Sequence, residues 1–89
     1  MIFKGQSNLS LEIETSISLA GASSGVIMYK KPSGKIGWWP GVLSGTTITC
    51  NMLPDYLDES GAWEMQSKVT FPTGVGLGAI TTMTVGTPL

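Results

Sequence analysis

Hydrophobic and polar residues alternate with a period of two along most of the chain, and this pattern predicts β-strands rather than helices. The clearest run covers residues 63–71, where large apolar side chains point to one side and Glu, Gln, Lys and Thr to the other. A half-buried strand places its apolar side in the core. The predicted core residues of this run are Trp63, Met65, Val69 and Phe71.

The same alternation appears in residues 9–14 and 47–52, and it adds Leu11, Ile13, Ile48 and Cys50 to the predicted core. Residues 26–31 and 36–43 are two further runs rich in β-branched and aromatic residues, which favour strands. A last stretch keeps apolar residues in phase, and the pattern predicts that they share one face of a strand. They are Val75, Leu77, Ala79, Met83 and Val85.

Turn-forming residues separate these runs. Residues 31–34 and 71–74 each combine a proline with a glycine two positions later, and breaks also occur at residues 19–22 and 44–45. Breaks about every 8 to 12 residues are typical of a sandwich or a small barrel. The prediction is therefore one all-β domain over residues 1–89, an antiparallel β-sandwich of about seven strands.

The segment of residues 53–61 is the one candidate for a helical turn. Its proline and carboxylates suit a short 3₁₀ or α turn that crosses between the sheets, with Tyr56 and Leu57 closing the end of the core. Asp55, Asp58 and Glu59 fall short of the ligand number and glycine placement of a calcium loop, so capping of the loop is the preferred interpretation.

Trp38 and Trp39 are adjacent on a predicted strand, so they point to opposite faces and one of them is expected at the surface. Aromatic side chains are enriched at protein interfaces. Pro40 follows them and removes a backbone donor, which favours an edge strand or a bulge. The candidate interface consists of Trp38, Trp39, Pro40 and Tyr29, and the alternative is a tryptophan partly covered by its own loop.

Charged residues make up 12% of the chain, against roughly 25% in soluble domains on average, and the net charge is −1. Either neighbouring subunits cover much of the surface, or Ser, Thr and Gly supply enough polarity. Few lysines lie at the strand edges, where they would discourage pairing with another chain, and their scarcity favours a homo-oligomer. Five lysines without an arginine give no basic surface for nucleic acid, and no segment has the roughly 20 apolar residues of a membrane span. No signal peptide is visible at the start.

The residues offer little for catalysis or for a cofactor. The chain has no His and one Cys, so Cys50 lacks a base and a disulfide partner, and zinc and haem sites of the usual kinds are excluded. Glu12 and Glu14 share a strand face, but that face is the solvated one. The glycines of residues 74–78 follow a turn instead of opening a helix, so they favour a bulge or a close backbone approach over a phosphate loop. We predict that the protein is not an enzyme.

The stretch LDESGAWEMQSKVTF resembles the approach to strand F of immunoglobulin-like domains, with Trp63 at or beside the corner aromatic. No second cysteine follows, so the antibody disulfide is lacking. The whole chain resembles small immunoglobulin-like modules of tailed-bacteriophage virion proteins, including the amino-terminal domain of baseplate upper proteins. The matching pieces are IFKGQ, SLAGAS, VIMYKKPSGKIGWW, SGTTITC and LDESGAWEMQSKVTFPTG.

This resemblance implies an immunoglobulin-like fold, a location in the virion after synthesis in the host cytoplasm, and a structural, adaptor or decoration role. The implied partners are other virion proteins of the tail, baseplate or head, and no catalytic residue is implied. The alternative function is a carbohydrate-binding module that stacks a host glycan on the outward tryptophan, with Tyr29 or Tyr56 beside it.

Overall fold

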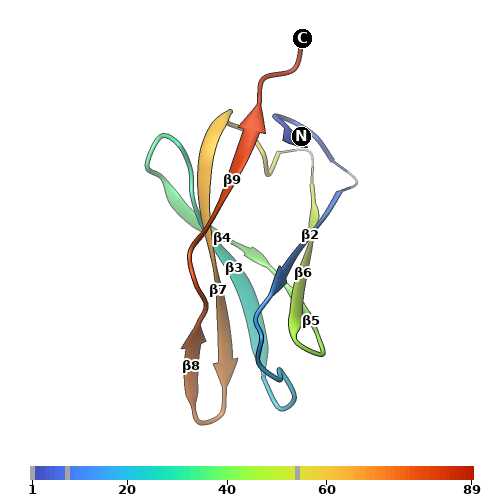
Figure 1. Cartoon of the computed structure of the whole chain (residues 1–89), viewed down its shortest axis with the longest axis vertical. Helices are drawn as coiled ribbons and strands as arrows, with labels where there is room; N and C mark the ends of the chain where they lie inside the picture. Colours follow the sequence, from blue (N-terminus) through green and yellow to red (C-terminus); the bar gives the residue numbers. More distant parts are fainter. Residues whose placement is uncertain (1, 8, 54) are drawn as a thin grey trace.

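The structure is a computed structural model that describes residues 2–7, 9–53 and 55–89. The described residues form strands and turns without a helix, and two sheets lie against each other as a sandwich (Figure 1). The prediction of an all-β sandwich is confirmed. Met1, Asn8 and Pro54 lie outside the described residues, and Pro54 is the proline expected to start a helical turn.

The larger sheet is built around β7 (Gly61–Phe71), the longest strand of the described residues. Its order is β1 (Ile2–Phe3), β9 (Thr81–Gly86), β7, β3 (Ser24–Lys30) and β4 (Ile36–Pro40), and β8 (Gly74–Leu77) also pairs with β7. All these pairs are antiparallel except β1 with β9, which are parallel. The smaller sheet has the order β2 (Leu9–Glu14), β6 (Thr47–Met52) and β5 (Val42–Ser44).

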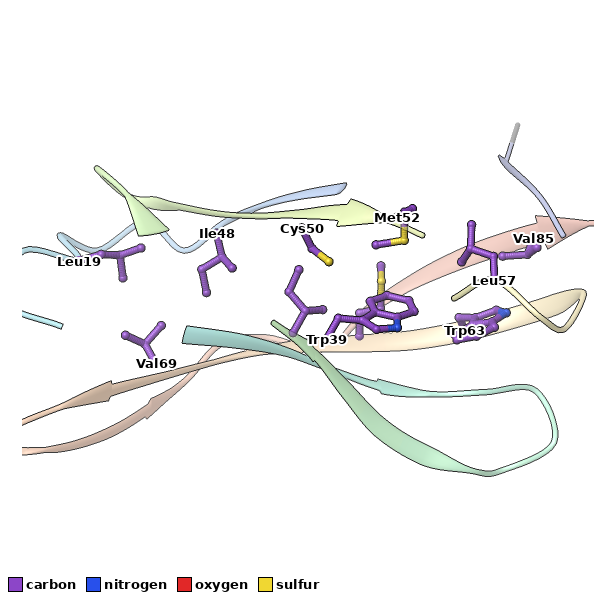
Figure 2. Close-up of a cluster of buried hydrophobic side chains, with 11 residues drawn as sticks. Leu19, Trp39, Ile48, Cys50, Met52, Leu57, Trp63, Val69 and Val85 are labelled. Carbon is purple, nitrogen blue, oxygen red and sulfur yellow. The ribbon is translucent and has the colours of Figure 1, made fainter. Parts of the chain in front are cut away.

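The core lies between the sheets, and the predicted core residues of the central strands are deeply buried there (Figure 2). Trp63, Met65, Val69, Ile48 and Cys50 have at most 4% of their surface exposed. The other three predicted core residues are only partly buried, although they pack against this cluster; they are Leu11, Ile13 and Phe71. Two of the three lie on β2, an edge strand of the smaller sheet, where one flank has no neighbouring strand to cover it.

An aromatic cluster fills one end of the core. The Trp63 ring lies 5.5 Å from Tyr29 and 5.7 Å from Trp39, and Tyr29 stacks on Trp39 at 4.5 Å. Trp63 is fully buried, and its Nε1–H donates a 3.0 Å hydrogen bond to the carbonyl oxygen of Glu59. This bond satisfies the one polar atom of the Trp63 side chain, whose burial without a hydrogen-bond partner would destabilise the fold.

The segment after β6 differs from the helical turn that the sequence predicts. Its described residues form turns, in which the Tyr56 N–H donates a single 3.0 Å bond to the Leu53 carbonyl. The side chains of Asp58 and Glu59 accept hydrogen bonds from the loop between β3 and β4, so they tie this segment to the hairpin and do not cap a helix. Leu57 is fully buried, and Tyr56 stacks on a core tryptophan, so this segment does close the core.

The predicted phase of residues 75–85 is wrong, because the paired strand is interrupted. β8 pairs Lys68 with Leu77, whereas β9 pairs Met65 with Thr81, so one extra residue lies between the two pairings. Because of this extra residue, side chains after the bulge point to the opposite face of the sheet from the one that regular alternation predicts. Leu77 is 61% exposed, whereas Val85 is buried.

Gly78 occupies this bulge. Its N–H donates to the Ser67 carbonyl at 2.9 Å, and a Cβ at Gly78 would overlap the Ser67 hydroxyl. A glycine is therefore needed at this close backbone approach, which agrees with the interpretation of the glycines of residues 74–78 as bulge-forming.

The predicted strand of residues 36–43 is divided between the two sheets. β4 ends at Pro40, which cannot donate to a ladder, and the Gly41 N–H bonds the Gly25 carbonyl at 3.1 Å. The chain then enters the smaller sheet as β5. β4 is an edge strand, as the proline indicates.

The loop between β3 and β4 is tied to the segment before β7 by an ion pair, Lys31 Nζ to Asp58 Oδ2 at 2.8 Å. The Lys31 hydrogen bond lowers the pKa of Asp58, so the pair stabilises the fold above the ordinary pKa of the carboxyl, and this contribution is lost as pH falls through the lowered value. Because the Asp58 side chain is 48% exposed, we expect Asp58→Asn to cost only about 0.5 kcal/mol at pH 7.

Urea unfolding at pH 7 and in the acid range measures this effect. The gap between the wild type and Asp58→Asn should close as the pH falls, whereas Asp55→Asn, in the same loop, should match the wild type throughout. A gap that stays constant between the two pH values would contradict the assignment.

Candidate interaction surface

The outer faces of the two sheets differ sharply in polarity. On the smaller sheet, strand alternation turns polar side chains outward, and Ser10 Oγ donates to Asn51 Oδ1 at 3.0 Å across two strands. Val42 is the one large apolar side chain of this face, and it is 69% exposed. The other outward residues of the three strands are Glu12, Glu14, Ser44, Thr47 and Thr49. This face is a solvated surface.

The larger sheet instead presents an apolar outer face. Its most exposed members are Ile36 at 77%, Ile80 at 63%, Trp38 at 62% and Leu77 at 61%. Residues directly opposite each other in a sheet share a face, and Trp38 lies opposite Met28 while Leu77 lies opposite Lys68. We define the apolar outer face by the residues Val26, Met28, Ile36, Trp38, Val75, Leu77 and Ile80.

Local sequence explains how each part of this face forms. The hairpin register places Trp39 opposite buried Ile27, so Trp39 points inward and Trp38 outward. On the other flank, the bulge at Gly78 turns Leu77 outward. Two independent features therefore bring apolar side chains to the same side of the sheet.

Two open hollows mark this face. One is lined chiefly by Met28, Ile36, Gln66 and Ile80, and the other by Val26, Met28, Trp38 and Lys68. Met28 borders both, so the hollows adjoin each other. Open and largely apolar depressions are suited to the side chains of a protein partner. A small molecule usually binds in a deeper cavity that encloses most of its surface.

Three charges lie among the apolar residues of this face. Lys30 and Glu64 lie directly opposite each other in the sheet, and Lys68 follows Glu64 four positions later on the same side of β7. Within the part of the chain that the structure describes, none of them forms an ion pair. Between the two β7 charges, Gln66 Nε2 donates to the Gly78 carbonyl at 2.8 Å, which holds its side chain across the bulge.

The structure separates the four residues of the predicted interface. Trp38 and Pro40 are exposed on β4, but Trp39 is 2% exposed and cannot contact a partner, which corrects its assignment to the interface. Tyr29 is partly buried and stacks on Trp39, so it lies on the inner side of the sheet.

The residues considered for chemistry lie apart from one another. Cys50 is 3% exposed, and burial raises the pKa of its thiol, which disfavours the reactive thiolate. Glu12 and Glu14 point to solvent from the smaller sheet. Hydrogen bonds from Thr46 and from the Ser16 N–H lower the pKa of Glu14, so this carboxyl stays ionised at neutral pH. Among the described residues, no three His, Cys, Asp or Glu side chains lie together as metal ligands would.

No family model matches the chain, and neither the curated proteins nor the solved structures include a match. Across residues 2–7, 9–53 and 55–89, no helix is long and apolar enough to cross a membrane.

Proposed function

We propose that this chain is a structural module without enzymatic activity, which assembles with other protein subunits through the apolar outer face of its larger sheet. The observation that supports the proposal most directly is the exposure of Ile36 and Trp38 beside Met28 on the outer face of the larger sheet, with Leu77 on the other side of the polar outward row of β7. Soluble monomers seldom expose contiguous large apolar patches, and such patches mark interaction sites.

The energetics favour a covered face. Full burial of one large apolar side chain stabilises an association by about 1.5 to 3 kcal/mol before the entropic costs of binding. Several such side chains lie on this face, among them Trp38 on the edge strand β4, and tryptophan is the residue type most enriched at the energetic centres of interfaces. The low charge of the chain, 12% of residues, gives little protection against association.

The order of the strands supports an immunoglobulin-like version of the sandwich. In that fold strands B, E and D share one sheet, and strands C, F and G share the other. β2, β6 and β5 correspond to the first group, and β3, β7 and β9 to the second. Cys50 lies on β6, which corresponds to neither of the strands that hold the antibody disulfide.

We place the module in the virion of a tailed bacteriophage, as part of the tail, baseplate or head. The support is the resemblance of its sequence to small immunoglobulin-like virion modules, together with an outer face made for protein contact. In this role the chain is synthesised in the host cytoplasm and contacts other virion proteins.

Incorporation into particles tests this proposal. We expect virions from cells that carry the gene to contain the protein at a fixed copy number, measured by quantitative mass spectrometry. A Trp38→Ala plus Leu77→Ser variant should reduce this number at least about tenfold, because two anchors that together contribute roughly 1.4 kcal/mol or more are lost. The matched control is Glu12→Ala on the opposite face, which should be incorporated normally.

Recovery of the wild-type protein only from the soluble lysate would contradict the virion role. A glycan array with the wild type and Trp38→Ala separates protein docking from sugar binding. We expect no glycan signal, because Tyr29 and Tyr56 stack on Trp39 at the core and leave Trp38 without a second ring beside it. A signal that disappears in Trp38→Ala would instead identify a carbohydrate-binding module.

A further inference from the structure

We propose that the apolar outer face binds a second copy of this chain, face to face, about a two-fold axis that runs across the strands along the row Trp38, Met28 and Gln66. The inference rests on the proposed function, since it names the first partner of the same face. Its basis is the arrangement of charges and apolar residues in the rows on either side of this axis.

The sheet register defines the rows. Met28 lies directly opposite Trp38 on β4 and directly opposite Gln66 on β7, so the three residues form one line across the sheet. The outward residues two positions away on β7 are Glu64 on one side and Lys68 on the other. A negative and a positive side chain therefore lie symmetrically about Gln66.

A two-fold axis that relates two stacked faces must lie in the plane between them. If it runs along this row, the strands of the second copy are antiparallel to those of the first, and residues before Gln66 face residues after Gln66. Glu64 then faces Lys68 of the second copy, and Lys68 faces its Glu64. Both charges, which lack an ion-pair partner within the described residues, gain one across the contact.

The apolar residues of β4 and the central Met28 fit the same axis, whereas Val26 then faces Lys30 and Leu77 faces Thr82 of the second copy. Trp38 and Met28 lie on the row and pack against their own counterparts, and Ile36, one row away, faces Pro40. The contact thus has Met28 near its centre, a pair of tryptophans at the β4 edge and the paired charges on β7.

Other ways to pair two copies are less favourable. An axis along β7 would place Glu64 against Glu64 and Lys68 against Lys68, a repulsion at both positions, and an axis along β3 would place both charges against apolar β4 without a partner. Stacking the apolar outer face on the smaller sheet of the next copy would bury Glu12 and Glu14, and a carboxylate without a partner is costly to bury.

The size of the face predicts a modest affinity. Four strands about 4.8 Å apart and about 23 Å long cover a flat area on the order of 400 Å². With side-chain relief, this approaches the roughly 600 Å² per partner of small, transient interfaces. We therefore expect a dissociation constant on the order of micromolar, so that monomer and dimer exchange within an accessible range of concentration.

Sedimentation equilibrium across a concentration series measures the association. The wild type should form a dimer, and Trp38→Ala should weaken it about 30-fold, because the substitution removes the tryptophan from both copies. Glu64→Lys and Lys68→Glu should each weaken the dimer about tenfold and leave the folded monomer intact, because each places like charges across the contact twice. The matched control, Glu12→Lys, makes the same charge change on the other sheet and should leave the dimer unchanged.

A charge exchange tests the axis itself. The double variant Glu64→Lys plus Lys68→Glu should dimerise like the wild type, and an equimolar mixture of the two single variants should form heterodimers in preference to either homodimer. A dimer indifferent to Trp38, or single variants that neither rescue nor complement each other, would overturn the geometry. A strict monomer at millimolar concentration would overturn self-association, whereas normal incorporation into virions would still support the proposed function.

Discussion

Replacing Trp63 with alanine is expected to lower the free energy of unfolding by about 3 to 5 kcal/mol. Trp63 has no exposed surface, and its ring lies beside the stacked rings of Tyr29 and Trp39 at the closed end of the core. The substitution removes these contacts, leaves a cavity, and deprives the Glu59 carbonyl of its indole donor. A domain of this size has roughly 5 to 13 kcal/mol of total stability, so this single substitution should remove between about a quarter and all of it.

Urea unfolding followed by circular dichroism measures this loss. Trp38→Ala is the matched control, since it removes the same side chain from an exposed position and should change the stability by about 0.5 kcal/mol or less. The comparison requires a protein concentration below the dissociation constant of the proposed dimer. Equal destabilisation by the two variants would show that Trp63 is not the centre of the core.

Period-two alternation was sufficient to predict the layers of this fold. Within residues 47–52, and again within residues 63–71, all apolar residues lie on the same side of the strand. Turning that side toward the core in each strand accounts for the burial of Ile48, Cys50 and Met65. Phe71 also faces the core but is only partly buried, because the alternation shows which way a side chain points and not how far the opposite sheet extends.

The sequence also indicated that one member of the Trp38 and Trp39 pair would be at the surface, but it did not show which one. That choice depends on the hairpin register, which pairs Trp39 with Ile27 and so places both in the core. The length of the turn at residues 31–34 determines this register, because it fixes which residues of the two flanking strands lie opposite each other.

The other flank of the apolar outer face could not be predicted from the alternation. Val75, Leu77 and Val85 occupy positions of the same parity, so a regular strand would place them on one side. One unpaired residue in the bulge separates Val75 and Leu77 from Val85, and the bulge includes a hydrogen bond from the Gly78 N–H to the Ser67 carbonyl on the neighbouring strand. Contacts between residues distant along the chain leave no local pattern beyond the glycine itself.

Gly41→Ala should have the second large effect, a destabilisation of about 2 to 3 kcal/mol. Gly41 lies where the chain passes from β4 to β5, and an added Cβ would overlap Cγ2 of Ile48 and lie 3.2 Å from the Gly25 carbonyl oxygen. Ile48 is fully buried and branched at Cβ, so its side chain has little freedom to move away. The Gly25 carbonyl is backbone, and it also accepts the Gly41 N–H, so relief of the contact would strain that hydrogen bond.

Thermal and urea unfolding of Gly41→Ala measure this cost against Gly76→Ala. Gly76 also lies in a strand, but its nearest neighbour to an added Cβ is a Phe71 ring carbon at 3.9 Å, an ordinary contact. The control should remain within about 0.5 kcal/mol of the wild type, because alanine fits the space and restricts the unfolded chain. If the two variants were equally stable, the crossing between the sheets would not depend on the close approach of Gly41 to Ile48, and the packing described for this corner would be wrong.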